Sequence, residues 1–114
     1  MNKRTTGSKY EEIAASYLIN KGYTIEARNY RDRFGEIDIV ARYSGQLIFV
    51  EVKYRRNASA GDPLEAVNRN KQKQIRNAAL SYMRFKGYNP ELMNIRFDCI
   101  GILGDKVNHI ENAF

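Results

Sequence analysis

Residues 8–21 are the first stretch of the chain with a clear hydrophobic pattern, because apolar side chains recur there at the spacing of one helix face. Ser8, with Glu11 three positions later, has the pattern of a capping box and predicts the helix start. Gly22 follows the last apolar position and predicts the helix end. The chain is therefore predicted to open with an amphipathic helix.

Alternation of apolar and polar residues with period two predicts β-strands further along the chain. It is clearest over 35–43 and 46–54, and Ser44-Gly45 between these segments fits a two-residue hairpin turn. Weaker strand patterns are found at three other places: 23–30, 95–103 and 107–110.

A second helix is predicted between the third and fourth strands. Asp62-Pro63-Leu64-Glu65 has the cap and first-turn residues of a helix start, although the polar run 68–70 could delay the start to about residue 69. Gly87 predicts its end. The order α-β-β-β-α-β-β predicts an α/β fold with a mixed sheet flanked by helices.

The composition indicates one globular domain over residues 1–114, with 43% hydrophobic and 28% charged residues. No apolar run approaches the roughly 20 residues that span a bilayer, and no secretory signal is visible, so a cytoplasmic location is expected. Cys99 is the only cysteine, which excludes an internal disulfide, and it is expected to be a buried core thiol. His109 is the only histidine, and nothing near it in the sequence suggests a catalytic triad.

Positive charge is concentrated in one segment of the chain. Residues 53–86 hold nine basic and two acidic residues, whereas the rest of the chain has a net charge of −1. Such a stripe is typical of a surface that binds a polyanion, although a solvated helix face would look the same.

The hairpin around Ser44-Gly45 brings charged residues together. Its register predicts Asp38 opposite Glu51 and Glu36 opposite Lys53, with all four on one face. Three apolar residues share that face, which is predicted to be half covered: Val40, Leu47 and Phe49. The other face is wholly apolar and must be buried: Ile37, Ile39, Ala41, Ile48, Val50 and Val52.

Two opposed carboxylates repel each other unless a cation lies between them. Mg²⁺ or Mn²⁺, held by Asp38 and Glu51, would fill that role, and Lys53 could then stabilise a phosphate or orient a water. This arrangement favours metal-assisted hydrolysis of a phosphodiester. A cross-strand ion-pair patch remains the alternative.

Glu11 is a candidate fourth member of this group. On a helical wheel it borders the buried face, whereas Glu12 points nearly the opposite way. Glu11 is therefore predicted either to face the carboxylates or to close the capping box with Ser8.

Asp38, followed thirteen residues later by Glu51-Val52-Lys53, resembles the PD-(D/E)xK signature of restriction-endonuclease-like enzymes. Longer motifs resemble, in order and over nearly the whole chain, the YraN family of bacterial proteins: Gly7-x3-Glu11-x2-Ala14, Tyr17-Leu18, Gly22-Tyr23, Asn29-Tyr30-Arg31, Gly35-Glu36-Ile37-Asp38, Phe49-Val50-Glu51-Val52-Lys53, Lys71-Gln72, Arg96-Phe97-Asp98 and Asn112-Ala113-Phe114.

This resemblance implies a restriction-endonuclease-like core, similar to that of archaeal Holliday-junction resolvases. It makes Asp38 and Glu51 metal ligands, Lys53 the catalytic lysine and Glu11 the helix-borne acid. Ile37 stands where the signature has proline, a position at which proline is often absent in this superfamily.

The function expected from these observations is a Mg²⁺-dependent nuclease acting on DNA, with branched or damaged DNA as candidate substrates. Resolvase-like action would require a homodimer, since two strands must be cut. Six basic residues are expected to position the nucleic-acid backbone: Arg55, Arg56, Arg69, Lys71, Lys73 and Arg76. The alternatives are a nucleic-acid-binding module that does not cut, and a protein-interaction domain.

Overall fold

The computed structural model describes residues 3–55 and 68–114, with side chains from residue 9 onward. Its elements are α1 (Lys3–Asn20), β1 (Thr24–Arg31), β2 (Glu36–Tyr43), β3 (Gln46–Arg55), α2 (Arg69–Lys86), the short 3₁₀ helix η3 (Pro90–Leu92), β4 (Ile95–Leu103) and β5 (Lys106–Ile110). The predicted α/β class and the predicted order of helices and strands are confirmed. No helix among the described residues is both long and apolar enough to cross a membrane.

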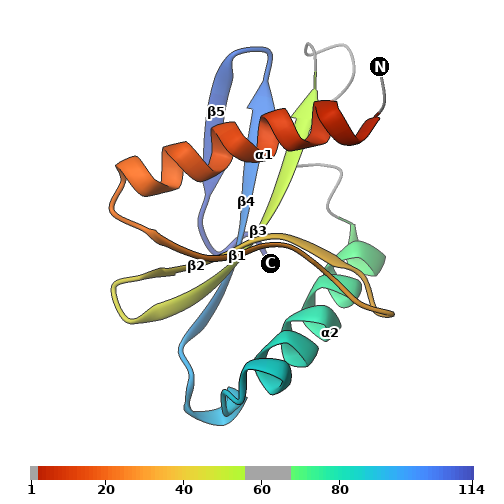
Figure 1. Cartoon of the computed structure of the whole chain (residues 1–114), viewed down its shortest axis with the longest axis vertical. Coiled ribbons are helices and arrows are strands. Elements are labelled where there is room, and N and C mark those ends of the chain that lie inside the picture. Colours follow the sequence, from red (N-terminus) through yellow and green to blue (C-terminus); the bar gives the residue numbers. More distant parts are fainter. Residues whose placement is uncertain (1–2, 56–67) are drawn as a thin grey trace.

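The five strands form one sheet in the order β1-β2-β3-β4-β5. Neighbouring strands run antiparallel except β3 and β4, which are parallel. A parallel pair needs a crossover connection, and α2 supplies it. Figure 1 shows the result, with α1 on one side of the sheet and α2 on the other.

The sheet is buried on both faces in its centre. Ala14 and Leu18 of α1 pack with Ile39 and Val50 on one face. On the other face, α2 forms a second core with Val40, Leu47, Phe49, Ile75 and Tyr82, among others. The expectation that Val40, Leu47 and Phe49 are only half covered is wrong, because α2 leaves each of them at most 1% exposed. Polar groups in these strands therefore need internal partners.

The two helices differ in how well the sequence predicts their starts. α1 begins at Lys3, so the predicted capping box is wrong and Ser8 lies inside the helix. The polar residues before Tyr10 carry no apolar repeat that could have indicated the extra turns. α2 begins at Arg69, with Asn68 as its N-cap, which agrees with the later of the two predicted starts. The start signals at 62–65 lie outside the described residues.

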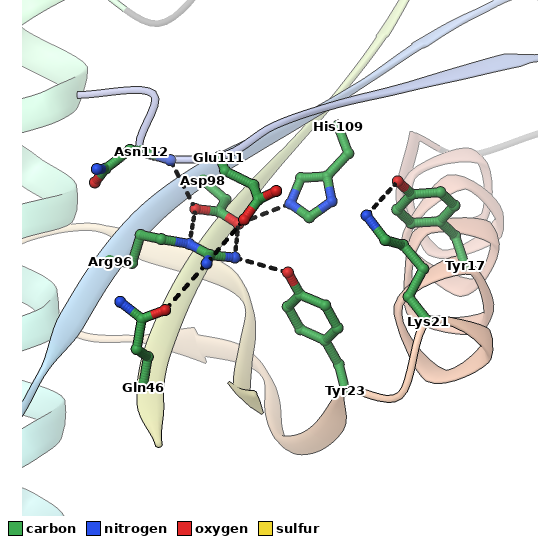
Figure 2. Close-up of polar contacts among 9 residues, drawn as sticks. All are labelled: Tyr17, Lys21, Tyr23, Gln46, Arg96, Asp98, His109, Glu111 and Asn112. Carbon is green, nitrogen blue, oxygen red and sulfur yellow. Dashed lines mark hydrogen bonds and ion pairs between the residues drawn. The ribbon is translucent and has the colours of Figure 1, made fainter. Parts of the chain in front are cut away.

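A buried polar network joins β4, β5 and the chain end (Figure 2). Asp98 is 0% exposed and accepts two hydrogen bonds of 2.8 Å from Arg96. It also lies 2.7 Å from Nε2 of His109 and accepts a bond from the backbone N–H of Asn112. Arg96 in turn donates to the hydroxyl of Tyr23 at 2.7 Å. The network thus ties the segment after β5 to the loop that leads into β1.

Candidate functional site

The β2–β3 ladder opens at one end, and the candidate site lies there. A tight turn at Ser44 and Gly45, with φ of 51° and 78°, sets the predicted register, which is confirmed as far as Ile39 opposite Val50. The ladder ends at that pair. The predicted pairs Asp38–Glu51 and Glu36–Lys53 are therefore wrong as ladder pairs.

β2 pairs with β1 along its length, and its first residues pair with β1 alone. Glu36 lies opposite Arg31, and Ile37 lies opposite Tyr30. Ile37 packs in the α2 core whereas Ile39 packs in the α1 core, so the predicted placement of both on one face is wrong. The face to which the side chains of β2 point therefore changes at Asp38, the residue between them, where the pairing with β3 has ended.

Asp38 fills the opening between the strands. Its Oδ2 accepts a 2.8 Å hydrogen bond from the backbone N–H of Val52 on β3. The carboxylate thus takes the place of a ladder carbonyl and satisfies a donor that would otherwise lose its strand partner. Asp38 is held across the gap by the main chain of the neighbouring strand.

Three carboxylates meet at this opening. Oxygens of Glu11, Glu36 and Asp38 all lie within 4.8 Å of one another. Glu11 comes from α1, so the prediction that it faces the carboxylates is confirmed. Glu12 instead pairs with Arg28 at 2.7 Å, and its side chain is 67% exposed.

Glu51 forms ion pairs with two lysines beside this opening. Its side chain is 5% exposed, and its Oε1 lies 3.4 Å from Nζ of Lys53 and 4.0 Å from Nζ of Lys71. Lys53 is on β3 beside Glu51, whereas Lys71 comes from the first turn of α2. Lys71 was predicted to contact the nucleic-acid backbone, and the structure places its ammonium group beside the Glu51 carboxylate.

The electrostatics of the opening disfavour a full set of negative charges. Burial, and then the carboxylate of Glu51, raises the pKa of Asp38 to about 8. Burial also raises the pKa of Glu51, although Lys71 and Lys53 oppose the shift. Burial raises the pKa of Glu11 as well, against the hydrogen bond from the side chain of Asn29. Such shifts are typical of functional carboxylates.

These residues fit a divalent cation by their chemistry. Carboxylate oxygens are the ligands that Mg²⁺ and Mn²⁺ prefer. A cation among them would offset both the burial and the repulsion that raise the pKa of Asp38. In the part of the chain that the structure describes, the carboxylates close enough to share one ion are Glu11 of α1 and Glu36 and Asp38 of β2, and Glu51 of β3 is not in that group.

The basic residues predicted to meet nucleic acid have different surroundings. Arg69 and Lys73 are exposed on α2. The guanidinium of Arg76 lies 4.8 Å from the ring centroid of Phe97 and 5.6 Å from that of Phe114, so it packs on aromatic rings. Arg55 donates to the backbone carbonyl of Tyr54. Arg56 lies outside the described residues.

Comparison with known proteins identifies the family. The sequence profile of the uncharacterised protein family UPF0102 matches residues 10–102. The chain belongs to this family. A UPF0102 protein of Lachnoclostridium phytofermentans is 49% identical over 114 residues, covering 100% of this chain and 96% of that protein. A UPF0102 protein of Fusobacterium nucleatum is 42% identical over 112 residues, covering 98% of this chain and 92% of that protein. This membership confirms the family assignment made from the sequence motifs.

Proposed function

We propose that this UPF0102 chain is a divalent-metal-dependent nuclease that hydrolyses phosphodiester bonds in DNA. The observation that carries the proposal is the convergence of Asp38 and Glu51 with two lysines at the opening between β2 and β3. A structural ion-pair patch has no need for carboxylates buried so close together that the pKa of Asp38 rises to about 8. Buried carboxylates beside cations are what metal-assisted hydrolysis requires.

Asp38 and Glu51 would hold the metal ion in this proposal, and Glu11 and Glu36 stand close enough to Asp38 to contribute oxygens. A bound Mg²⁺ or Mn²⁺ would supply positive charge to the phosphate and lower the pKa of a water molecule. In the hydrolysis, the water oxygen bonds to phosphorus, one ester P–O bond breaks, and the proton of the water ends on the leaving oxygen.

Lys53 and Lys71 would act on the substrate side of the site. Both ammonium groups are within 4.0 Å of the Glu51 carboxylate, so both are next to the proposed metal position. Their charges would bind the scissile phosphate and stabilise the negative charge that develops on it. Lys53 also matches the lysine of the PD-(D/E)xK signature.

The outer surface of α2 would position the nucleic-acid backbone. Arg69 and Lys73 are exposed on the helix that carries Lys71, so a phosphate chain in the site could extend along them. DNA is proposed as the substrate because of the likeness to the PD-(D/E)xK signature. Branched DNA is proposed because of the likeness to resolvases.

A cleavage assay tests the proposal directly. Purified protein is incubated with duplex, single-stranded, flap and four-way-junction DNA, and with duplex RNA, in Mg²⁺, Mn²⁺ or EDTA. We expect metal-dependent cleavage of at least one DNA substrate, lost in Lys53→Ala and retained in Glu12→Gln. Binding without cleavage under all conditions would support the non-catalytic binding module. Equal activity of wild type and Lys53→Ala would point to a contaminating nuclease.

A further inference from the structure

Asn29 has an unusual backbone for a strand residue. Its φ is 54°, in the left-handed region. Two other non-glycine residues in the described part of the chain have positive φ: Ser44 in the β2–β3 turn and Asn112 beyond β5. Asn29 is thus the one such residue found inside a described strand. Left-handed backbone is unfavourable for most side chains, and such strain gathers at functional sites.

The left-handed backbone at Asn29 changes the side of the sheet to which the side chains of β1 point. In a regular strand, successive side chains point to opposite faces. Here Arg28 contacts Glu12 of α1 at 2.7 Å, and the side chain of the next residue, Asn29, lies close enough to Glu11, also of α1, to oppose the rise in the pKa of that carboxyl. Tyr30 then turns to the opposite side and bonds Ser81 of α2. Two consecutive side chains therefore point toward α1.

The position of Asn29 in the sheet places it beside the carboxylates. Arg28 lies opposite Ile39 and Tyr30 lies opposite Ile37, so Asn29 lies across from Asp38. Its amide can donate to a carboxylate without adding charge. Without Asn29, β1 would offer Glu11 no uncharged amide donor at the place where Glu11 faces Glu36 and Asp38.

We infer that Asn29 is a positioning residue of the site: its left-handed backbone turns the side-chain amide onto Glu11 and holds that carboxylate toward Asp38. The inference rests on the proposed metal site and adds a residue that does not itself touch metal or substrate. Groups that hydrogen-bond a metal ligand orient it, and their loss lowers metal affinity by about 10-fold to 100-fold.

Substitution by glycine separates two possible roles of Asn29: its left-handed backbone conformation and its side-chain amide. Glycine adopts the left-handed conformation freely but has no amide side chain. Asn29→Gly should therefore keep its melting temperature and bind Mn²⁺ about 10-fold more weakly, measured by calorimetric titration with Mn²⁺ alone. Asn29→Ala should bind Mn²⁺ equally weakly and also melt lower. Ser44→Gly, at the left-handed turn away from the site, is the matched control and should bind as wild type does.

A double variant tests whether Asn29 acts through Glu11. In the Glu11→Gln background, adding Asn29→Gly should cause no further loss of Mn²⁺ affinity. An additional 10-fold loss there would overturn the inference, as would wild-type affinity in Asn29→Gly alone. A wild-type protein that does not bind Mn²⁺ would instead overturn the metal site itself, and the role of Asn29 with it.

Discussion

Lys71 and Lys73, two residues apart on α2, are expected to have different roles, one in the chemistry and one in DNA binding. Lys71 lies 4.0 Å from the buried Glu51 carboxylate, whereas Lys73 is exposed on the same helix. Lys71→Ala should lower the cleavage rate at saturating DNA, because it removes a charge next to the scissile phosphate. Lys73→Ala should leave that rate unchanged and reduce the log–log salt slope of duplex binding by about 0.9.

Single-turnover cleavage and salt-dependent binding, measured on both variants, check this division. Wild-type cleavage by Lys71→Ala at saturating DNA would show that Lys71 contributes only to binding.

The sequence reveals some of the site residues and not others. Asp38, Glu51 and Lys53 are found because their spacing matches a signature, and Glu11 because a helical wheel turns it inward. Lys71 is not assigned to the chemistry, because its approach depends on how α2 lies against β3. Glu36 is placed on the same face as Asp38 but given no role, and Asn29 is left out of the site, because the opening of the ladder and one left-handed residue have no sequence signal of their own.

At the scale of elements, the first turn of α2 matters because it carries Lys71. The side chain of Asn68 caps this helix by accepting a 2.9 Å hydrogen bond from the backbone N–H of Lys71. Asn68→Ala should lower the free energy of unfolding by about 1 kcal/mol, because that donor loses its partner. Asn70→Ala, two residues into the exposed first turn, is the control and should not destabilise the protein.

Urea unfolding of the two variants measures the difference. A free energy of unfolding in Asn68→Ala equal to that of Asn70→Ala would mean that the cap does not stabilise the helix.

Element boundaries are predicted well where local chemistry sets them. The turn at Ser44-Gly45 and the left-handed Gly87, with φ of 77°, end their elements where the sequence indicates. The start of α1 and the end of the β2–β3 ladder are mispredicted, because neither is determined by residues at the boundary. The ladder ends where β2 loses its pairing with β3 while it stays paired with β1, which is a tertiary event.

For the whole molecule, two buried aspartates make stability depend on pH in opposite ways. Burial would raise the pKa of Asp98, but hydrogen bonds from His109 and Arg96 outweigh it and lower the pKa. A lowered pKa gives stability that is present at higher pH and lost as the pH falls. Burial and Glu51 raise the pKa of Asp38 to about 8, so its contribution is present at low pH and lost as the pH rises through about 8.

The metal-free protein should therefore be most stable at about pH 4, because the contribution of Asp98 is lost below that pH and the contribution of Asp38 is lost above it, up to about pH 8. Melting temperatures measured in EDTA from pH 2 to 9 should fall toward both ends. Asp38→Asn should flatten the decline on the high-pH side, because the amide cannot ionise and its oxygen can still accept from Val52. A high-pH decline of wild-type steepness in Asp38→Asn would assign that decline to other groups.

The claim that the opening between β2 and β3 binds a metal ion is tested most directly by melting wild type and Asp38→Asn with and without Mn²⁺. In EDTA at pH 9, above the pKa of Asp38, the variant should melt above the wild-type temperature, because Glu51 loses a close like-charged neighbour. Mn²⁺ should raise the wild-type midpoint by binding only the folded state, and should raise the variant far less. A variant that melts clearly lower in EDTA, together with a wild type that Mn²⁺ does not stabilise, would contradict the metal site and leave a structural ion-pair cluster in its place.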